Sequence, residues 1–150
     1  MTRVRIAALF AVLTSLALVL PAAASAGSAQ LRMLQKVNNF RQAHGVGKVH
    51  LSHSLERSAT SYSRHMMRSG YFGHASRIHA SRSYRTLGEI IELQRGMRAG
   101  VGQAFRAWVH SPPHRNVMLM SQFRFAGAGL VHGRFQGHRQ TIWTMHFGRH

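Results

Sequence analysis

The chain has 150 residues and no cysteine, and its 20 Lys and Arg residues against three acidic residues give a formal net charge of +17. This length fits one domain around a single hydrophobic core. The lack of cysteine excludes the small secreted scaffolds that disulfides hold together, and it excludes catalysis by a cysteine nucleophile.

The N-terminus has the layout of a secretory signal peptide. Residues 1–5 include two arginines, residues 6–20 form an apolar run without a charge, and small residues follow at 24–26. A bilayer needs about 20 apolar residues, so we expect cleavage after Ala26 and not a permanent anchor. The sequence thus predicts a signal peptide over residues 1–26 and one domain over residues 27–150, located in the extracellular space or the periplasm.

The basic composition predicts attraction to polyanions. Cleavage would remove only Arg3 and Arg5, and all 12 histidines would remain to add positive charge in mild acid. Anionic envelope polymers or a membrane surface are candidate partners by charge alone, although the same charge fits a protein with no particular partner. The arginines lack the aromatic interleaving of dedicated nucleic-acid binders, so no specific nucleic acid recognition is expected.

Two helices are predicted in the first half of the domain. Apolar residues at helical spacing predict a helix over residues 29–44 that ends at Gly45. Its buried stripe is expected to comprise Leu31, Leu34, Val37 and Phe40. A second helix is predicted from Ser52, whose hydroxyl can cap it, to Gly70. Residues 71–86 show no sustained period and predict a long surface loop, a kind of segment that often carries sites.

The second half predicts a short element, two helical segments and two strands. The short element covers residues 87–93, and an amphipathic helix through Trp108 must end at Pro112. A further short turn of helix is expected at residues 114–118. The two strands are expected from the alternation of Phe123, Phe125, Gly127 and Gly129 and from residues 142–147, with Trp143, Met145 and Phe147 on one face. Helices first and strands last predict an α+β fold.

Four segments, in this order, resemble the motifs of a known family. Residues 37–45 are similar to the opening helix of bacterial SCP-like domains, 70–74 to an aromatic-x-His motif, 87–91 to a Gly-Glu-Asn-Ile motif, and 108–116 to a Trp-x-x-Ser-Pro-Gly-His-Arg motif. Residues 125–129 and 143–148 follow the fourth motif. The chain therefore resembles the CAP superfamily of cysteine-rich secretory proteins over nearly all of residues 27–150. The resemblance implies a three-layer α-β-α sandwich.

The resemblance also implies a cleft at whose floor His74, Glu89 and His114 converge, with Ser111 and Arg115 beside them. His74 and His114 could share a zinc ion, which binds imidazole nitrogens at about 2.0–2.1 Å. The same trio can equally be a hydrogen-bonded cluster in which Glu89 orients a histidine. Two departures affect the pocket: Ser111 stands where eukaryotic relatives have a second glutamate, and Ile90 stands where the family usually has asparagine.

Other residues near these motifs allow further interpretations. Glu92 lies three residues after Glu89 and could share a helical face with it, or pair with an arginine. Arg115 could hold an acidic ligand group bidentately. A Ser111–His114–Glu89 triad is conceivable, but Ser111 before two prolines is more simply a helix cap. The remaining histidines are expected to be structural, because His138, His146 and His150 have no consistent metal spacing, and Trp108 and Trp143 are expected in the core.

Three functions follow from these residues and the resemblance. The leading hypothesis is a secreted binding protein whose cleft holds a small or extended ligand, lipid or sterol-like as the resemblance implies. The second is a metal-assisted hydrolase of peptide or envelope polymer, with His74 and His114 as metal ligands and Glu89 as base. The third is a cationic effector that binds polyanions or membranes by charge. Of these, binding without catalysis is preferred.

Overall fold

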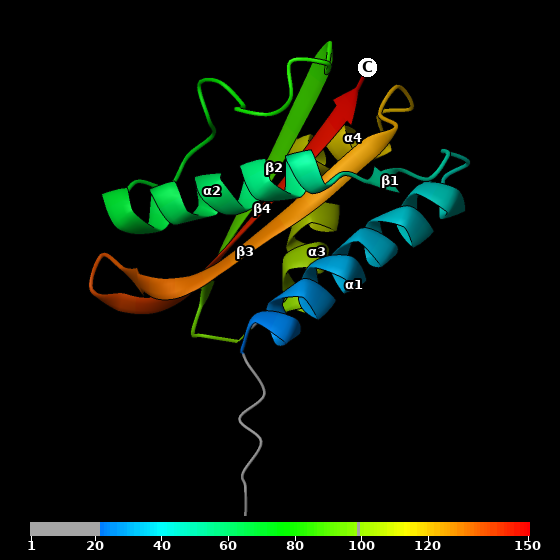
Figure 1. Cartoon of the computed structure of the whole chain (residues 1–150). Coiled ribbons are helices and arrows are strands. Elements are labelled where there is room, and N and C mark those ends of the chain that lie inside the picture. The colour runs from blue at the N-terminus through cyan, green and yellow to red at the C-terminus, as the bar shows by residue number, and fades with distance from the viewer. Residues whose placement is uncertain (1–21, 99) are drawn as a thin grey trace, which may run out of the picture.

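The computed structural model of the chain describes residues 22–98 and 100–150 (Figure 1). The predicted signal peptide lies largely outside this part, and its expected cleavage site after Ala26 falls within the first helix. Within the described ranges, no helix combines the length and apolar character needed to cross a membrane. The elements are, in chain order, α1 (Ala22–Ala43), β1 (His50–Leu51), α2 (His53–Ser69), β2 (Thr86–Arg95), α3 (Val101–His110), α4 (Pro112–Leu119), β3 (Phe125–Phe135) and β4 (His138–Arg149).

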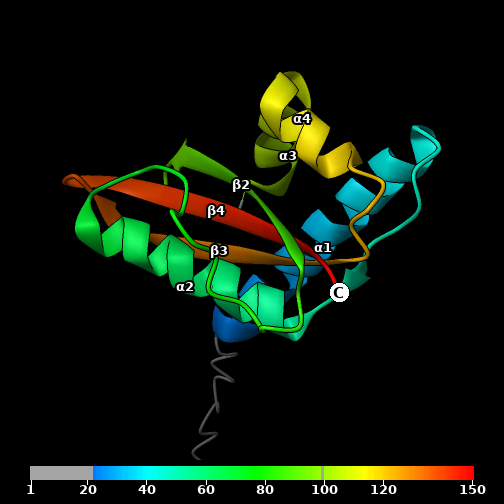
Figure 2. The same cartoon turned by 90° about the horizontal axis from the view of Figure 1, so that it is seen from above.

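The four strands form one sheet with helices on both faces. The strand order is β1-β3-β4-β2, in which β4 pairs antiparallel with both β3 and β2 while β1 runs parallel to β3. Helix α2 covers one face of the sheet, and α1, α3 and α4 cover the other (Figures 1 and 2). This arrangement confirms the predicted α+β fold and the three layers that the resemblance implied.

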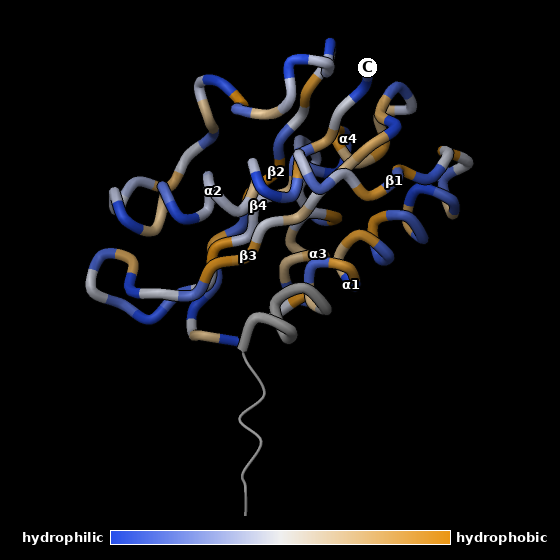
Figure 3. The backbone as a smooth tube through the Cα atoms, in the orientation of Figure 1, coloured by the Kyte–Doolittle hydropathy of each residue, from blue (hydrophilic) through white to orange (hydrophobic). Residues whose placement is uncertain are grey.

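The main hydrophobic core fills the space between the sheet and the α1, α3 and α4 layer. Trp108 and Trp143 are fully buried there, and the Trp108 indole donates a hydrogen bond of 3.0 Å to the carbonyl of Ile91. Met145 and Phe147 lie in the same core, which confirms the predicted face of β4. Hydrophilic and hydrophobic stretches follow one another along the tube of α1 (Figure 3), as expected of a helix with one apolar face on a core.

Local signals set the helix ends as predicted. The Ser52 hydroxyl accepts a hydrogen bond from the Leu55 amide at the start of α2, and Gly70 ends that helix in the left-handed conformation, with φ of 67°. Helix α1 ends at Ala43, and Gly45 has φ of 70°. These conformations carry no steric cost at glycine.

The predicted stripe of α1 is wrong at its first residue. Leu31 is 52% exposed, whereas Met33 is fully buried. The buried face instead passes through Ala29, Met33 and Val37, a spacing of four residues that keeps these side chains on one side of the helix. Leu34 and Val37 are buried as expected.

Helix α2 packs with its backbone directly against β3. A methyl group on Gly127 would lie 2.2 Å from the Glu56 nitrogen, and one on Gly129 would lie 2.3 Å from the Thr60 nitrogen. The predicted alternation of glycines on this strand is confirmed, although the strand begins at Phe125, and Phe123 is buried just before it. This close contact holds the side chains of α2 against the strands that carry the candidate site.

Candidate functional site

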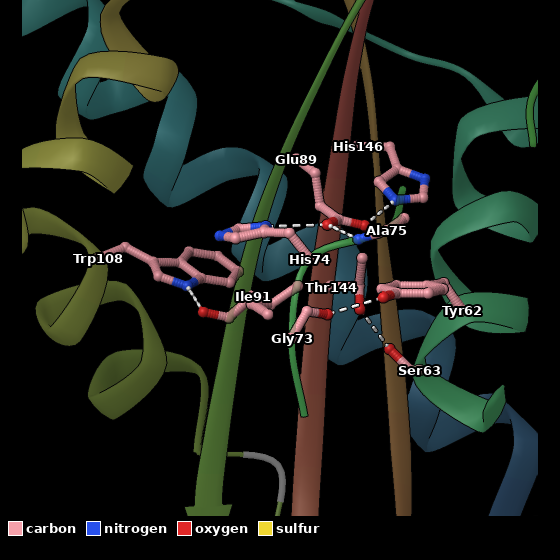
Figure 4. A network of polar contacts seen from close by, with 10 residues as sticks. All are labelled: Tyr62, Ser63, Gly73, His74, Ala75, Glu89, Ile91, Trp108, Thr144 and His146. Atoms are coloured by element: carbon pink, nitrogen blue, oxygen red, sulfur yellow. Dashed lines mark hydrogen bonds and ion pairs between the residues drawn. The ribbon is translucent and has the colours of Figure 1, made fainter. Parts of the chain in front are cut away.

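A buried carboxylate, that of Glu89 on β2, forms the centre of the candidate site. Its side chain is 5% exposed. One oxygen accepts hydrogen bonds of 2.9 Å from the Ala75 amide and from His74 Nδ1, and the other accepts one of 2.9 Å from His146 Nε2 (Figure 4). Because both oxygens are bonded, the carboxylate is held in one orientation.

Sheet register places His146 beside Glu89. The two residues are directly paired across β2 and β4, so both side chains point to the same face of the sheet, toward α2. The second ring nitrogen of His146 lies 3.0 Å from the hydroxyl of Ser58 on α2. With Nε2–H donated to Glu89, the Nδ1 atom of a neutral ring accepts from Ser58, which fixes the tautomer and the position of this imidazole.

The surroundings keep Glu89 ionised. Burial by itself would raise the pKa of this carboxyl, but hydrogen bonds from His146, the Ala75 amide and His74, together with the charge interaction with His146, outweigh it and hold the pKa below its usual value. A carboxylate with a lowered pKa is a weak proton acceptor at neutral pH, so the site is poorly suited to use Glu89 as a general base.

The structure brings together the three side chains that the resemblance grouped. The His114 ring on α4 lies 6.1 Å from the His74 ring, measured between centroids, and His74 is bonded to Glu89. Burial and the neighbouring His74 lower the pKa of His114. The same arrangement leaves His74 58% exposed, while His146 is 1% exposed. His74 is therefore far more accessible to solvent or a ligand than His146, and His114 is half-buried.

Ser111 and Arg115 lie outside the hydrogen-bonded group around Glu89 in the described part of the chain. Ser111 occupies the junction of α3 and α4, where its side chain makes no capping hydrogen bond. Within the described part of the chain, no hydrogen bond joins it to His114 or to Glu89, as a catalytic triad would need. Arg115 is exposed on α4.

A pocket of about 560 Å³ opens beside this group, between α2 and the loop that follows it. His74 and His146 border it, with Ser58 and Tyr62 from α2 and Ala75 from the loop. The Tyr62 hydroxyl donates a hydrogen bond of 2.7 Å to the Gly73 carbonyl, which ties this loop to the helix. His114, Ser111 and Arg115 do not border this pocket. The pocket therefore borders all three residues that hold Glu89.

The donor atoms are not arranged as a complete metal site. Across residues 22–98 and 100–150, no group of three His, Cys, Asp or Glu side chains is placed to hold a metal ion. His74 and His114 are near enough to supply two imidazoles, while one oxygen of Glu89 already accepts two hydrogen bonds and the other accepts one. Glu89 therefore has one acceptor position left, on the oxygen that accepts from His146.

Comparison with known proteins settles the family. The family described as CAP, the cysteine-rich secretory protein family, matches residues 34–147 of this chain. The chain belongs to the CAP family. Among curated proteins, this CAP domain is similar to the uncharacterized protein YkwD of Bacillus subtilis, with 27% identity over 135 residues that cover 84% of this chain and 49% of YkwD. The chain thus spans about half the length of that relative.

Solved structures show the same fold. An extracellular protein of Bacillus anthracis that contains an SCP domain is similar with a TM-score of 0.64 and 21% identity, covering 83% of this chain and 41% of that one. An outer surface protein of Borrelia burgdorferi is similar with a TM-score of 0.65 and 15% identity, covering 81% and 92%. These likenesses support the CAP fold of this chain.

The sequence analysis missed His146, which it expected to be structural on the basis of metal spacing alone. In the CAP domain, this residue lies on the opposite face of β4 from Trp143, Met145 and Phe147. Because α2 packs over that side of the sheet, the second face of β4 is buried as well (Figure 1). A buried polar side chain needs a partner, so the histidine at this position was a signal for a partner such as Glu89.

The expectation that Glu92 shares a face with Glu89 is wrong. Residues 86–95 form a strand, β2, and side chains three residues apart on a strand point to opposite faces. Glu92 therefore lies on the other side of the sheet from the pocket. Burial raises the pKa of its carboxyl, and no hydrogen bond or ion pair joins it to the described residues.

Proposed function

We propose that this CAP domain is an extracellular binding protein that holds a small polar ligand in the pocket beside Glu89. The observation that supports it is the pocket itself, in which His74 and His146 are both fixed by one buried carboxylate. Its volume of about 560 Å³ lies in the range of small-molecule sites. Groups held in place before a ligand arrives lose little entropy on binding, which favours affinity.

His74 is the side chain best placed to contact the ligand. Its Nδ1 is bonded to Glu89, while its Nε2 makes no hydrogen bond to the described residues and the side chain is 58% exposed. In the neutral ring with Nδ1 protonated, Nε2 accepts a hydrogen bond. A ligand hydroxyl or amide can supply that donor.

The lining favours a polar ligand over a lipid or sterol. Ala75 and Ile78 are the aliphatic residues of the wall, and the others carry hydroxyl, imidazole, phenol or guanidinium groups. A sterol site needs mostly apolar walls, because the apolar surface of the sterol is stabilised when it leaves water and contacts apolar side chains. Extracellular location is supported by the signal-peptide pattern and by neighbours described as extracellular or outer-surface proteins.

The test is a fragment screen by NMR on the 15N-labelled full-length chain. Binding is expected to shift the amide resonances of Ser58, Tyr62 and Ala75 more than those of residues outside the pocket. A matched pair of variants locates it: Ser61→Trp places a large ring at the pocket wall and should abolish these shifts, while Ser121→Trp, on an exposed turn far along the chain, should not. A screen whose ligands shift only other regions, or none, contradicts the proposal.

The proximity of His74 and His114 favours one further candidate, the binding of zinc by these two imidazoles, with metal-assisted hydrolysis as its use. Calorimetric titration of the full-length chain with zinc tests it. Heat that disappears in His74→Ala and in His114→Ala but persists in His53→Ala would support a site between α4 and the loop. No heat at neutral pH rejects it.

A further inference from the structure

We propose that the pocket beside Glu89 recognises a phosphate monoester, with Arg68 and Arg77 as the side chains that bind its phosphate. The inference rests on the proposed function and names the chemical class of ligand for that same pocket. Arg68 belongs to the last turn of α2, and Arg77 belongs to the loop that follows, so two elements contribute one cation each to a single wall.

The pocket wall is entirely neutral or basic. Besides the two arginines, imidazoles from His65, His74, His79 and His146 border it, and no acidic side chain does. Every charged group that faces the interior therefore favours an anion. A hollow lined by charges of one sign concentrates the opposite ion, because its low-dielectric walls focus the field.

Neither arginine is neutralised by the protein. Within the described residues, Arg68 and Arg77 take part in no side-chain hydrogen bond or ion pair. None of the three acids pairs with either arginine: Glu56 pairs with His53 at 3.0 Å, Glu89 is bonded to His74 and His146 behind the wall, and Glu92 lies across the sheet. Two guanidinium groups at one pocket thus keep all of their donors for a ligand.

The charge of the wall selects the class of anion. A carboxylate carries one negative charge, whereas a phosphate monoester carries about −1.5 to −2 at pH 7 and offers three acceptor oxygens. Two arginines together match such a group, because each guanidinium can donate two parallel hydrogen bonds to phosphate oxygens. Neutral imidazoles with a free N–H can donate further bonds.

The size and aromatic rim of the pocket indicate that the phosphate is attached to an organic group. A volume of about 560 Å³ holds far more than one inorganic ion. The Tyr71 ring is 62% exposed at the rim and lies over Gly73, where an added methyl group would come within 2.5 Å of the tyrosine oxygen. The Tyr62 ring stacks on His65 at 5.9 Å between centroids. These rings offer flat faces to a sugar or an aromatic ring.

The experiment measures the binding of four probes to the full-length chain by calorimetry at fixed salt. The probes are phenyl phosphate, phenyl sulfate, phenol and inorganic phosphate. Phenyl phosphate is expected to bind at least about tenfold more tightly than each of the others, since only it combines the dianion with an organic body. Inorganic phosphate that binds equally well contradicts a monoester and assigns the site to free phosphate.

A pair of charge-matched variants locates the anion. Arg68→Gln/Arg77→Gln should weaken phenyl phosphate binding by about tenfold or more, whereas Arg57→Gln/Arg85→Gln, which removes the same charge from exposed positions outside the pocket, should change it less than about twofold. Equal losses in both variants mean attraction by net charge and overturn the inference.

The outcomes separate this inference from the proposed function. If neutral fragments shift Ser58 and Ala75 and are blocked by Ser61→Trp, while phenyl phosphate binds no better than phenol, then the pocket is a binding site but not an anion site. If no fragment or probe reaches the pocket, the proposed function itself is wrong.

Discussion

Two buried charged side chains, Arg41 and Glu89, are satisfied in different ways. Arg41 is fully buried, and its guanidinium donates hydrogen bonds to four backbone carbonyls, those of Gly47, Met118, Met120 and Phe123. Glu89 accepts hydrogen bonds from one backbone amide and from two imidazoles. The partners of Arg41 are all backbone groups, whereas two of the three partners of Glu89 are side chains.

The difference separates a structural tie from a binding site. Arg41 joins the end of α1 to the end of α4 and to the segment just before β3, and all of its partners are backbone carbonyls. The partners of Glu89 are imidazoles that border a pocket, and His74 keeps a free nitrogen. A buried charge therefore indicates a functional site when its partners can also reach solvent.

The largest effect is expected from Arg41→Met. This change removes four hydrogen bonds and leaves the carbonyl oxygens of Gly47 and Met118 without a donor, so the free energy of unfolding should fall by about 3–5 kcal/mol. Urea unfolding measures it, and Arg57→Met, at an exposed position of α2, should change stability by less than about 0.5 kcal/mol. A loss below about 1 kcal/mol for Arg41→Met contradicts its role as a tie.

A smaller effect, confined to the Glu89 side of the sheet, is expected from Gly127→Ala. The new methyl group would meet the Glu56 backbone at 2.2 Å, so α2 must move, at a cost of about 1–3 kcal/mol. Hydrogen exchange should quicken in α2 more than in α1. Gly47→Ala is the control, because nothing lies within 4 Å of its added methyl group. Equal changes in both helices would show that the two regions are not independent.

Glu89→Gln tests the ionised carboxylate. Its pKa is lowered in the fold relative to the usual value of 4.5, so the carboxylate stabilises the protein above that pH, and this stabilisation is lost as the pH falls through the lower folded value. The free energy of unfolding of the wild type should be about 1–3 kcal/mol higher than that of the variant at pH 7. The gap should shrink below about pH 4.5 in urea titrations. A gap that stays constant from pH 7 to pH 3 contradicts this pKa.

Local signals in the sequence predicted most of the helices, because caps and breakers act within a few residues. Ser52, Gly70 and Pro112 each marked an end that the structure confirms. Strand β1 was not predicted, since two residues are too few to show a period. Its place is set by pairing with β3, far along the chain.

The candidate site was predictable only through the resemblance to a family, which grouped His74, Glu89 and His114. Periodicity could not place His146, because its burial depends on the packing of α2 over the second face of β4. The expectation that Glu92 and Glu89 share a face was wrong because it assumed helical spacing, whereas these residues form a strand, in which side chains three residues apart point to opposite faces. The role of Arg41 gave no local signal either, since its carbonyl partners lie 6, 77, 79 and 82 residues away.

The smallest effect on stability is expected from His74→Ala, which separates a binding role of this imidazole from a structural one. The Ala75 amide and His146 still hold Glu89 in this variant, and the lost side chain is 58% exposed. The free energy of unfolding, measured in urea, should therefore change by less than about 1 kcal/mol. Binding of pocket ligands should nevertheless weaken, whereas His53→Ala, which removes an imidazole bonded to Glu56 outside the pocket, should leave binding unchanged. A stability loss near that of Arg41→Met would make His74 a second structural tie.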